Sequence, residues 1–414
     1  MSRPPAQPPV FYICGDTARN AARSGIQTVV RSLLAAFGAM GAPVRPVIWR
    51  ANSALLRPLP PTWSLGLGAE PLRDPPTPPS AFLPHPVSWL PYLAAGGNAA
   101  LIPLHQHPRH LTAPPGSWVL LPELLYGGER ADQLVDYVHR QGWRLAAILH
   151  DAIPVQHPEY VPPHLPGEHA RYMRALSRAD LILPNSEYTA GGWREFLGRE
   201  NLPSPPTKVC TLACDFPGVP RSRALPAPRT PSRDQPVRLL CVSTLEPRKN
   251  HRALFAAFDL AVARRPDLPL ALDLVGAPYV DAHDIADAAR AFAARHPGRV
   301  QWHERTEQAT LQRLYAGCDF TVYPSLLEGF GIPVIESLWF ARPCLCASFG
   351  VMAENAEGGG CLTTDTRDPQ ALADAILRLA SSPELRCRLA REAATRHLKT
   401  WCEYAGEILA ALSN

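Results

Sequence analysis

The chain has 414 residues, 47 of them proline, and this length suits two domains of roughly 200 residues better than one hydrophobic core. A formal net charge of +4 argues against nucleic acid as an obligate partner and permits only weak attraction to an anionic membrane surface. Neither a signal peptide nor a run of about 20 apolar residues that could span a membrane is apparent in the sequence.

The first half of the chain alternates predicted strands with predicted helices. The expected strands are 10–14, 44–49, 118–122, 144–150 and 181–184, and the expected helices are 25–37, 131–141, 165–178 and 187–197. Residues 51–117 are rich in proline, and we expect only irregular segments with short elements there. The alternation predicts an α/β domain with a parallel, doubly wound sheet.

A second series of the same kind follows a proline-rich stretch at 217–236, which has the composition of a linker. Its expected strands are 238–243, 270–275, 300–302, 320–323 and 343–347, and its expected helices are 250–263, 280–296, 310–316, 334–340 and 370–379. We therefore divide the chain into a first domain (1–222), a linker (223–236) and a second domain (237–399). A ligand is expected between the two domains, beyond the carboxyl ends of the strands.

Two acidic residues bracket a glycine turn in Glu328-Gly-Phe-Gly-Ile-Pro-Val-Ile-Glu336. The turn offers backbone N–H groups and a helix N-terminus near Ile332, a favourable seat for an anion. Glu328 lies on the loop and Glu336 lies along the helix, so the two fit opposite ends of one extended polar ligand. A partner in a buried salt bridge would be a sufficient interpretation of Glu336 alone, but not of the whole segment together with the Arg-Lys pair upstream.

Adjacent cations occur in Leu245-Glu-Pro-Arg-Lys-Asn-His251, where a strand ends and a helix begins. Arg248 can form a two-pronged contact with phosphate oxygens, and Lys249 supplies a point charge. A solvated cation pair is the alternative, but the helix macrodipole disfavours cations at this end. An anion that offsets this cost is the better explanation, and the pair therefore predicts a diphosphate site.

Polar residues also follow two strands of the first domain. His150 and Asp151 lie in His-Asp-Ala-Ile-Pro, after a strand, where a hydrogen-bonded structural pair is the alternative to a role in binding. Ser186, in Asn-Ser-Glu-Tyr-Thr, fits a ligand contact and a helix cap equally well. Gly25, in Arg-Ser-Gly-Ile-Gln, allows a close approach of the backbone to a ligand.

Several other patterns do not support a site. His105, His107 and His110 lack carboxylate or thiol partners nearby, and Gly66-x-Gly68 lacks the third glycine of a dinucleotide fingerprint. The ten cysteines show no regular framework, which favours free thiols in a reducing cytoplasm over a zinc site or disulfides. No Asp-x-Asp pair is present to hold a divalent ion on a diphosphate, so neither a metal nor another cofactor is expected.

Taken together, the Glu-Pro-Arg-Lys-Asn, Glu-x7-Glu, His-Asp-x-Ile-Pro and Ser-Gly-Ile segments resemble the retaining glycosyltransferases of family 4, which have the GT-B fold. The resemblance covers the second domain densely and the first in islands. It implies two Rossmann-like domains facing across a cleft, with the first binding the acceptor and the second binding the donor. It also implies that a final helix, at 400–414, returns onto the first domain.

The resemblance further implies roles for the acidic turn and the cations. Arg248 and Lys249 would hold the donor diphosphate and stabilise it as it leaves, and Glu328 would approach hydroxyl groups of the donor sugar. Glu336 would accept hydrogen bonds from the ribose. The donor would also contact the backbone of the segment comprising Gly329, Phe330, Gly331 and Ile332.

In the first domain, His150 would face the donor sugar and Asp151 would orient the sugar or the acceptor. Gly25 would pack near the phosphates, and Ser186 would lie in the cleft.

The expected activity is that of a retaining hexosyltransferase in which the acceptor hydroxyl attacks from the leaving-group side. Its motifs resemble bacterial enzymes of lipopolysaccharide and exopolysaccharide synthesis, for which GDP-mannose is the leading donor and a glycan or lipid-linked saccharide the acceptor. Peripheral contact with the inner membrane belongs to this expectation. A nucleotide-sugar epimerase, a phosphorylase or a non-catalytic sugar-nucleotide-binding subunit remain alternatives.

Overall fold

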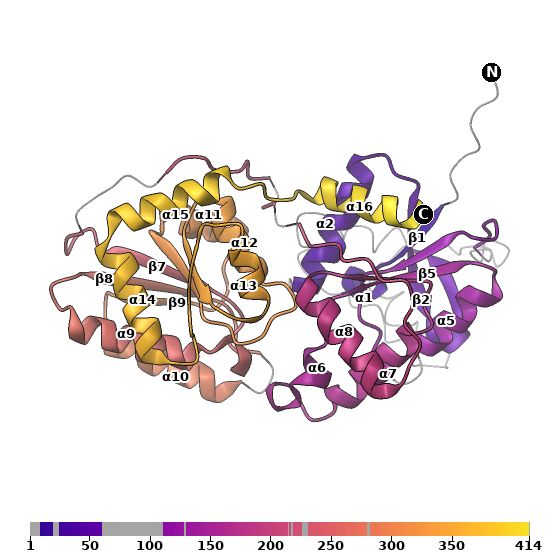
Figure 1. Cartoon of the computed structure of the whole chain (residues 1–414), viewed down its shortest axis with the longest axis horizontal. Coiled ribbons are helices and arrows are strands. Elements are labelled where there is room, and N and C mark those ends of the chain that lie inside the picture. Colours follow the sequence, from indigo (N-terminus) through magenta and orange to yellow (C-terminus); the bar gives the residue numbers. More distant parts are fainter. Residues whose placement is uncertain are drawn as a thin grey trace, which may run out of the picture. The chain divides into compact units, whose positions relative to one another are not determined.

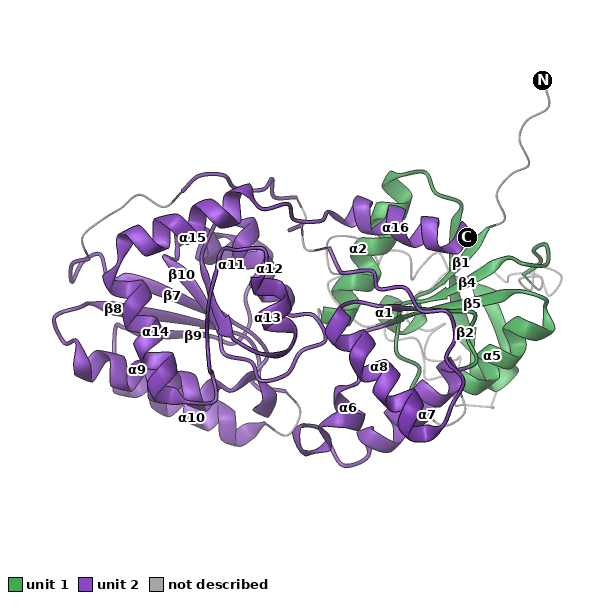
Figure 2. Cartoon of the chain, in the orientation of Figure 1, with its two compact units in different colours: residues 1–148, 178–182 green, residues 149–177, 183–414 purple. Residues whose placement is uncertain are grey.

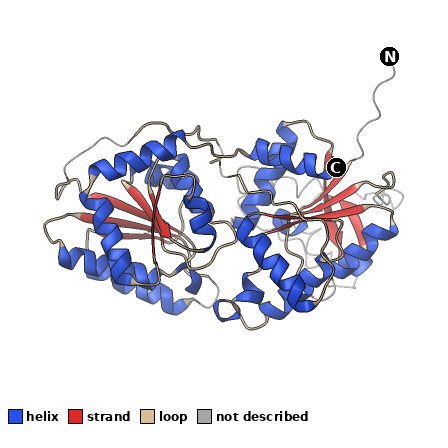
Figure 3. Cartoon of the chain, in the orientation of Figure 1, coloured by secondary structure: helices blue, strands red, loops and turns tan. Residues whose placement is uncertain are grey.

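The computed structural model describes residues 9–19, 25–59, 111–127, 130–213, 215–216, 218–225, 231–279 and 282–413, and two six-stranded sheets dominate these residues (Figure 1). Most of the proline-rich segment, both dismissed patterns within it and Cys214 lie outside the described residues. Each sheet carries helices on its two sides, as Figure 3 shows. The expected doubly wound α/β architecture is therefore confirmed.

The first sheet has the strand order β3-β2-β1-β4-β5-β6. Its strands are β1 (Val10–Ile13), β2 (Val44–Arg50), β3 (Leu55–Pro58), β4 (Trp118–Leu121), β5 (Arg144–Leu149) and β6 (Leu181–Pro184). The pairs β1–β2, β1–β4 and β4–β5 are parallel, whereas β3 pairs antiparallel with β2 at the edge. The helices of this half are α1 (Gly15–Arg19), α2 (Gly25–Ala39), α5 (Arg130–Arg140), α6 (Ile153–Gln156), α7 (Leu165–Leu176) and α8 (Glu187–Glu200).

The second sheet is parallel throughout, with the order β12-β11-β10-β7-β8-β9. Its strands are β7 (Val237–Val242), β8 (Leu270–Val275), β9 (Val300–His303), β10 (Phe320–Tyr323), β11 (Cys344–Ala347) and β12 (Cys361–Thr364). Its helices are α9 (His251–Arg264), α10 (His283–Arg295), α11 (Gln308–Gly317), α12 (Ile332–Trp339), α13 (Gly350–Ala356), α14 (Pro369–Ser381) and α15 (Pro383–Thr395). The final helix is α16 (Trp401–Ser413).

The core of the second sheet explains why its strands are continuous apolar runs. Both faces of a parallel sheet are covered by helices, so alternate side chains of a strand are buried on opposite faces. Leu239 of β7 and Phe320 of β10 pack with apolar residues of α9, α10 and α14 in one cluster. Cys344 and Cys346 of β11 pack with Val334 of α12 and with α13 in a separate cluster.

By internal packing the chain divides into two compact units, residues 1–148 with 178–182 and residues 149–177 with 183–414 (Figure 2). This division follows packing density, and the functional boundaries at 222 and 237 remain predictions. The return of the last helix onto the first domain also remains a prediction. In the part of the predicted linker that is described, 223–225 and 231–236, no helix or strand is present.

Six elements were not expected from the sequence, namely β3, β12, α1, α6, α13 and α15. The edge strands β3 and β12 are short and partly exposed, and neither is a clear apolar run. Helices α6 and α13 have only four and seven residues, too few for a helical period to stand out. Among the described residues, no helix is both long and apolar enough to cross a membrane.

Candidate functional site

The predicted cation and glycine motifs lie at the point where the strand order of the second sheet reverses. Strands β7 and β10 are neighbours there, although β8 and β9 separate them in the chain. The loops that follow these two strands diverge to opposite sides, and ligands of open α/β sheets bind in the resulting crevice. One loop carries Arg248 and Lys249, and the other carries Glu328.

The loop after β7 forms a 3-10 turn, Pro247–Lys249, that ends at Asn250 in the left-handed conformation (φ 57°). Asn250 Nδ2 donates to the carbonyl oxygen of Thr366 at 2.7 Å, which fixes this unusual corner. The amide of Leu326, in the loop after β10, donates to the Arg248 carbonyl oxygen at 2.8 Å. The two loops are thus joined by the backbone itself.

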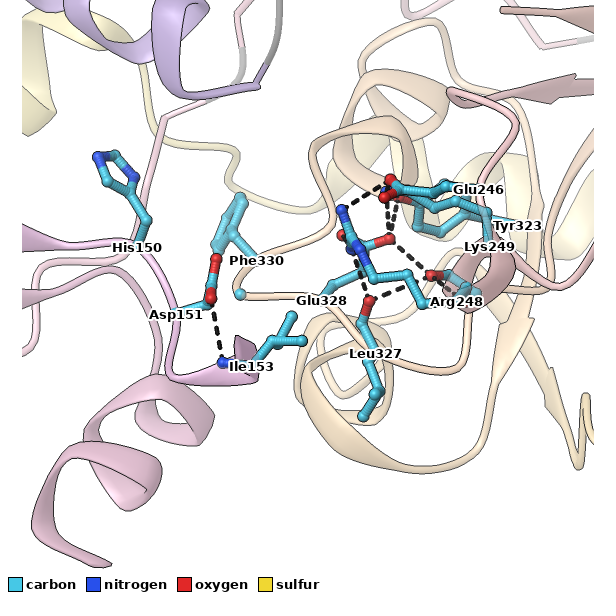
Figure 4. Close-up of polar contacts among 12 residues, drawn as sticks. His150, Asp151, Ile153, Glu246, Arg248, Lys249, Tyr323, Leu327, Glu328 and Phe330 are labelled. Atoms are coloured by element: carbon cyan, nitrogen blue, oxygen red, sulfur yellow. Dashed lines mark hydrogen bonds and ion pairs between the residues drawn. The ribbon is translucent and has the colours of Figure 1, made fainter. Parts of the chain in front are cut away.

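Glu328 is the centre of the site (Figure 4), and only 7% of its surface is exposed. Its Oε2 accepts from Arg248 Nη1 at 2.8 Å, and its Oε1 accepts from Lys249 Nζ at 2.5 Å. Tyr323 and Ser325 each donate a hydroxyl hydrogen bond to the same Oε1 at 2.6 Å. The carboxylate therefore binds both cations predicted to hold the diphosphate.

A second carboxylate completes the charge balance. Glu246 Oε1 lies 2.8 Å from Arg248 Nη2 and 4.0 Å from Lys249 Nζ. The two cations are thus matched by two carboxylates. The sequence argument required an external anion to offset the cost of cations before helix α9; in the structure, Glu246 and Glu328 already offset it.

The pKa shifts follow from this arrangement. Burial alone would raise the pKa of Glu328, but Arg248 and Lys249 outweigh it and hold that pKa well below its usual range. Burial opposes the charge on Arg248, yet Glu328 and Glu246 raise its pKa. Burial, followed by the neighbouring Arg248, lowers the pKa of Lys249. Glu328 is accordingly ionised at neutral pH.

The glycine turn presents unpaired donors beside this cluster. Within the described residues, the backbone N–H groups of Gly329, Phe330, Gly331 and Ile332 have no hydrogen-bond acceptor. Gly331 precedes α12 with φ 84°, in the left-handed region that favours glycine. Buried N–H groups without acceptors are rare in proteins. This turn is therefore suited to an anion or to hydroxyl groups of a ligand.

Glu336 is placed one turn into α12, as expected from its spacing to Glu328. Its Oε2 accepts from the Tyr315 hydroxyl at 2.8 Å, and no described cation pairs with it. The interpretation of Glu336 as a buried salt-bridge partner is therefore wrong, because its partner is a neutral phenol. Burial raises the pKa of Glu336, and the hydrogen bond from Tyr315 offsets only part of that rise.

His150 and Asp151 lie on the other side of Phe330 from the cations in Figure 4, with the His150 ring directed away from them. The His150 side chain is buried, and Asp151 Oδ1 accepts from the amide of Ile153 at 3.0 Å at the start of α6. Ser186 caps α8, since its Oγ accepts from the amide of Thr189 at 3.0 Å. The cap interpretation of Ser186 is confirmed.

Gly25, the remaining predicted residue, is the exposed first residue of α2 in the other compact unit. Its predicted contact with phosphate remains a prediction.

Sequence reasoning missed the supporting residues Glu246, Tyr323, Ser325 and Tyr315. Glu246 stands within the cation motif and Ser325 precedes Glu328 by three residues, so their polar side chains were a usable signal. Tyr315 lies in helix α11, and no sequence signal linked it to the site. Among the described residues, no group of three or more His, Cys, Asp or Glu side chains could hold a metal ion.

Comparison with known proteins supports this description. Residues 236–382 match the family model Glycosyl transferases group 1. The chain is 29% identical over 243 residues to O-antigen chain mannosyltransferase B of Escherichia coli, covering 57% of this chain and 61% of that protein. It is 28% identical over 172 residues to D-inositol 3-phosphate glycosyltransferase of Corynebacterium glutamicum (strain R), covering 40% and 41% of the two chains. These matches span less than two thirds of either relative.

Solved structures share the fold over nearly the whole chain. Anabaena HepE in complex with UDP-glucose aligns with a TM-score of 0.64 at 17% identity, covering 98% of this chain and 100% of that one. Sucrose-phosphate synthase from Thermosynechococcus elongatus aligns with a TM-score of 0.63 at 16% identity, covering 98% of both chains. The fold is GT-B, and the chain resembles bacterial mannosyltransferases.

Proposed function

We propose that this chain is a retaining hexosyltransferase that moves a hexose from a nucleotide sugar to a glycan or lipid-linked saccharide. The observation that carries the proposal is the convergence of Arg248, Lys249 and the four unpaired amides at 329–332 on the strand-order reversal of the second sheet. Cations and free N–H groups at such a crevice suit a ligand that carries both phosphate and hydroxyl groups.

In the proposed reaction, Arg248 and Lys249 stabilise the negative charge that develops on the diphosphate as it leaves. Such preorganised electrostatic stabilisation is commonly the largest contribution to catalysis. The bond between the anomeric carbon and the diphosphate oxygen breaks, and the acceptor oxygen forms its bond on the same face. The departing diphosphate oxygen takes the acceptor proton, so no protein base is required.

Glu328 has two tasks in this scheme. Its ionised carboxylate holds the cations in place and also accepts hydrogen bonds from donor-sugar hydroxyls. Glu336 accepts from the ribose, and His150 and Asp151 orient the sugar from the strand end that precedes α6. Residues 237–399 form the donor domain, with 1–222 serving the acceptor.

GDP-mannose is the leading donor because two of the similar proteins are mannosyltransferases by name. UDP-glucose is the competing donor, since the HepE structure contains it. We therefore propose to incubate the protein with each nucleotide sugar and a pool of saccharide and lipid-linked saccharide acceptors. Release of nucleoside diphosphate together with an extended glycan supports a transferase.

Two variants locate the activity. Lys249→Ala should lower the rate roughly 10²–10³-fold, as loss of a preorganised charge contact does. Arg252→Ala is the matched control, because Arg252 is an exposed cation three residues away that pairs with Asp284 at 2.9 Å. Equal rates in Lys249→Ala and Arg252→Ala would contradict the assignment, provided that both variants unfold like the wild type.

The same assay separates the alternatives. An isomerised sugar nucleotide without free nucleoside diphosphate would indicate an epimerase, and turnover that requires inorganic phosphate would indicate a phosphorylase. Binding without turnover would indicate a non-catalytic subunit. We also propose a cytoplasmic location with peripheral contact at the inner membrane, which sedimentation with anionic vesicles would test.

A further inference from the structure

The first turn of α8 is bonded directly to the glycine turn. Ser186 Oγ donates to the carbonyl oxygen of Gly329 at 2.7 Å while it accepts from the amide of Thr189. A hydroxyl has one donor hydrogen and two acceptor lone pairs, so both bonds can form together. Thr189 Oγ1 lies 3.1 Å from the same Gly329 oxygen. All three residues are buried, so water does not compete for these bonds.

Gly329 also lies against the strand end that carries His150. A Cβ placed on Gly329 would stand 1.9 Å from the His150 carbonyl oxygen, so only glycine fits. The His150 oxygen in turn accepts from Asn185 Nδ2 at 2.8 Å. The segment 185–189 therefore binds the carbonyl groups of both chain segments where they meet.

Helix α13 also anchors this arrangement. Glu354 accepts from the amides of Glu187 and Tyr188, each at 3.0 Å, and so holds the first turn of α8. The next residue, Asn355, donates through Nδ2 to the carbonyl oxygen of Phe330. Consecutive residues of one helix thus fix both the α8 turn and the glycine turn.

These bonds determine where the unpaired amides point. The carbonyl group of one residue and the N–H group of the next share a planar peptide unit and point in opposite directions. A side chain that holds the Gly329 oxygen therefore orients the Phe330 N–H to the other side. Holding the Phe330 oxygen orients the Gly331 N–H in the same manner. Both N–H groups lack a described acceptor.

We propose that Ser186, Thr189 and Asn355 are positioning residues that aim the Phe330 and Gly331 N–H groups at the hexose of the donor. They act through the two carbonyl groups and do not touch the donor themselves. The proposal rests on the transferase function proposed above and adds a determinant of sugar recognition to it. Since Arg248 and Lys249 are held by other residues, loss of this support leaves binding of the diphosphate intact.

The test compares the affinity for a sugar nucleotide with the affinity for its nucleoside diphosphate. Calorimetry with GDP-mannose and GDP, and with UDP-glucose and UDP, first identifies the pair that the wild type binds. In Ser186→Ala/Thr189→Val and in Asn355→Ala, the affinity for the sugar nucleotide should fall about tenfold, the cost of misplacing one hydrogen bond. The affinity for the nucleoside diphosphate should stay within twofold, and kcat should fall as well.

Two further variants separate positioning from stability. Ser186→Asp keeps an oxygen that caps α8 but has no hydrogen to donate, so it should lose sugar-nucleotide affinity as Ser186→Ala/Thr189→Val does. Ser186→Thr keeps both functions and should restore sugar-nucleotide affinity. Equal losses for both ligands, or recovery in Ser186→Asp, would overturn the proposal. Failure of the wild type to bind either sugar nucleotide would instead overturn the proposed transferase function.

Discussion

Replacement by glutamine should destabilise the protein far more at Glu328 than at Glu336. The two carboxylates bracket the same glycine turn, Glu328 buried and Glu336 half-buried, and the two substitutions are matched in size and chemistry. Their partners differ, because Glu328 binds Arg248 and Lys249 whereas Glu336 accepts from the Tyr315 hydroxyl. Their pKa values are correspondingly shifted in opposite directions, down for Glu328 and up for Glu336.

The magnitude follows from the charges that remain. Glu328→Gln turns a balanced set of two cations and two carboxylates into one with a buried excess positive charge. The amide nitrogen of the new side chain must also oppose either Arg248 or Lys249, donor against donor. Removing one partner of a buried ion pair costs about 3–5 kcal/mol. Glu336→Gln keeps an acceptor for Tyr315 and loses no ion pair, so its cost should stay below about 1 kcal/mol.

Urea unfolding at pH 7, monitored so that the transition of the part that holds the second sheet is resolved, measures both differences in stability. A depressed folded pKa gives Glu328 a stabilising contribution that is complete above its unfolded pKa and is lost as the pH falls through the folded value. The difference in the free energy of unfolding between the wild type and Glu328→Gln should therefore become smaller below about pH 4.5. Equal effects of the two substitutions at pH 7, or a gap that widens in acid, would refute the assigned electrostatics.

Three further outcomes are expected. Gly329→Ala should destabilise the protein by about 2 kcal/mol or more and abolish sugar-nucleotide binding, because the added Cβ would meet the His150 carbonyl oxygen. Gly191→Ala on α8 is the control, because the space around Gly191 is open and the substitution should be tolerated. Thermal-shift assays of both variants measure the difference. Burial lowers the pKa of His251 from 6.5 to about 3, so between these pH values the unfolded chain binds a proton that the folded chain does not. Between pH 7 and pH 5 the free energy of unfolding should therefore fall by about 2 kcal/mol more in the wild type than in His251→Gln, as measured by urea titration. Transfer should proceed within twofold of its full rate after dialysis against EDTA, and a larger loss that Mg²⁺ restores would show that the two cations do not replace a metal.

The sequence predicted the second sheet well because its strands are buried on both faces. Strands β8 and β10 begin and end where the apolar runs do, and α12 starts at Ile332 as the glycine turn indicated. The half-exposed edge strand β12 gave no such signal, since Cys361-Leu-Thr-Thr is neither an apolar run nor an alternation of polar and apolar residues. Edge strands of this kind are determined by pairing with β11 rather than by their own composition.

The identity of the site residues could also be predicted, but their partners could not. Motif spacing placed Arg248, Lys249 and Glu328 at strand ends, and the structure brings them into contact. Which of the two acidic residues pairs with the cations depends on how the loops after β7 and β10 cross. Sequence reasoning considered a salt bridge for Glu336, which is on a helix, although the loop residue Glu328 forms it. Spacing along a chain does not encode a contact across 79 residues.

The balance of charge around Glu328 affects how strongly such a site would hold its charged product. A transferase must stabilise the diphosphate more in the transition state than as a bound product, because equal stabilisation would only slow product release. Unopposed, two buried cations would hold the fully charged product strongly. With Glu246 and Glu328 bonded to them, Arg248 and Lys249 keep their geometry, while their net attraction for a distant anion is small. The unpaired amides at 329–331 add a short-range, directional contribution that depends on the bound geometry. The carboxylates therefore do more than hold the cations in place: they make stabilisation depend on close, correctly oriented contact, which is the form that favours a transition state over its product.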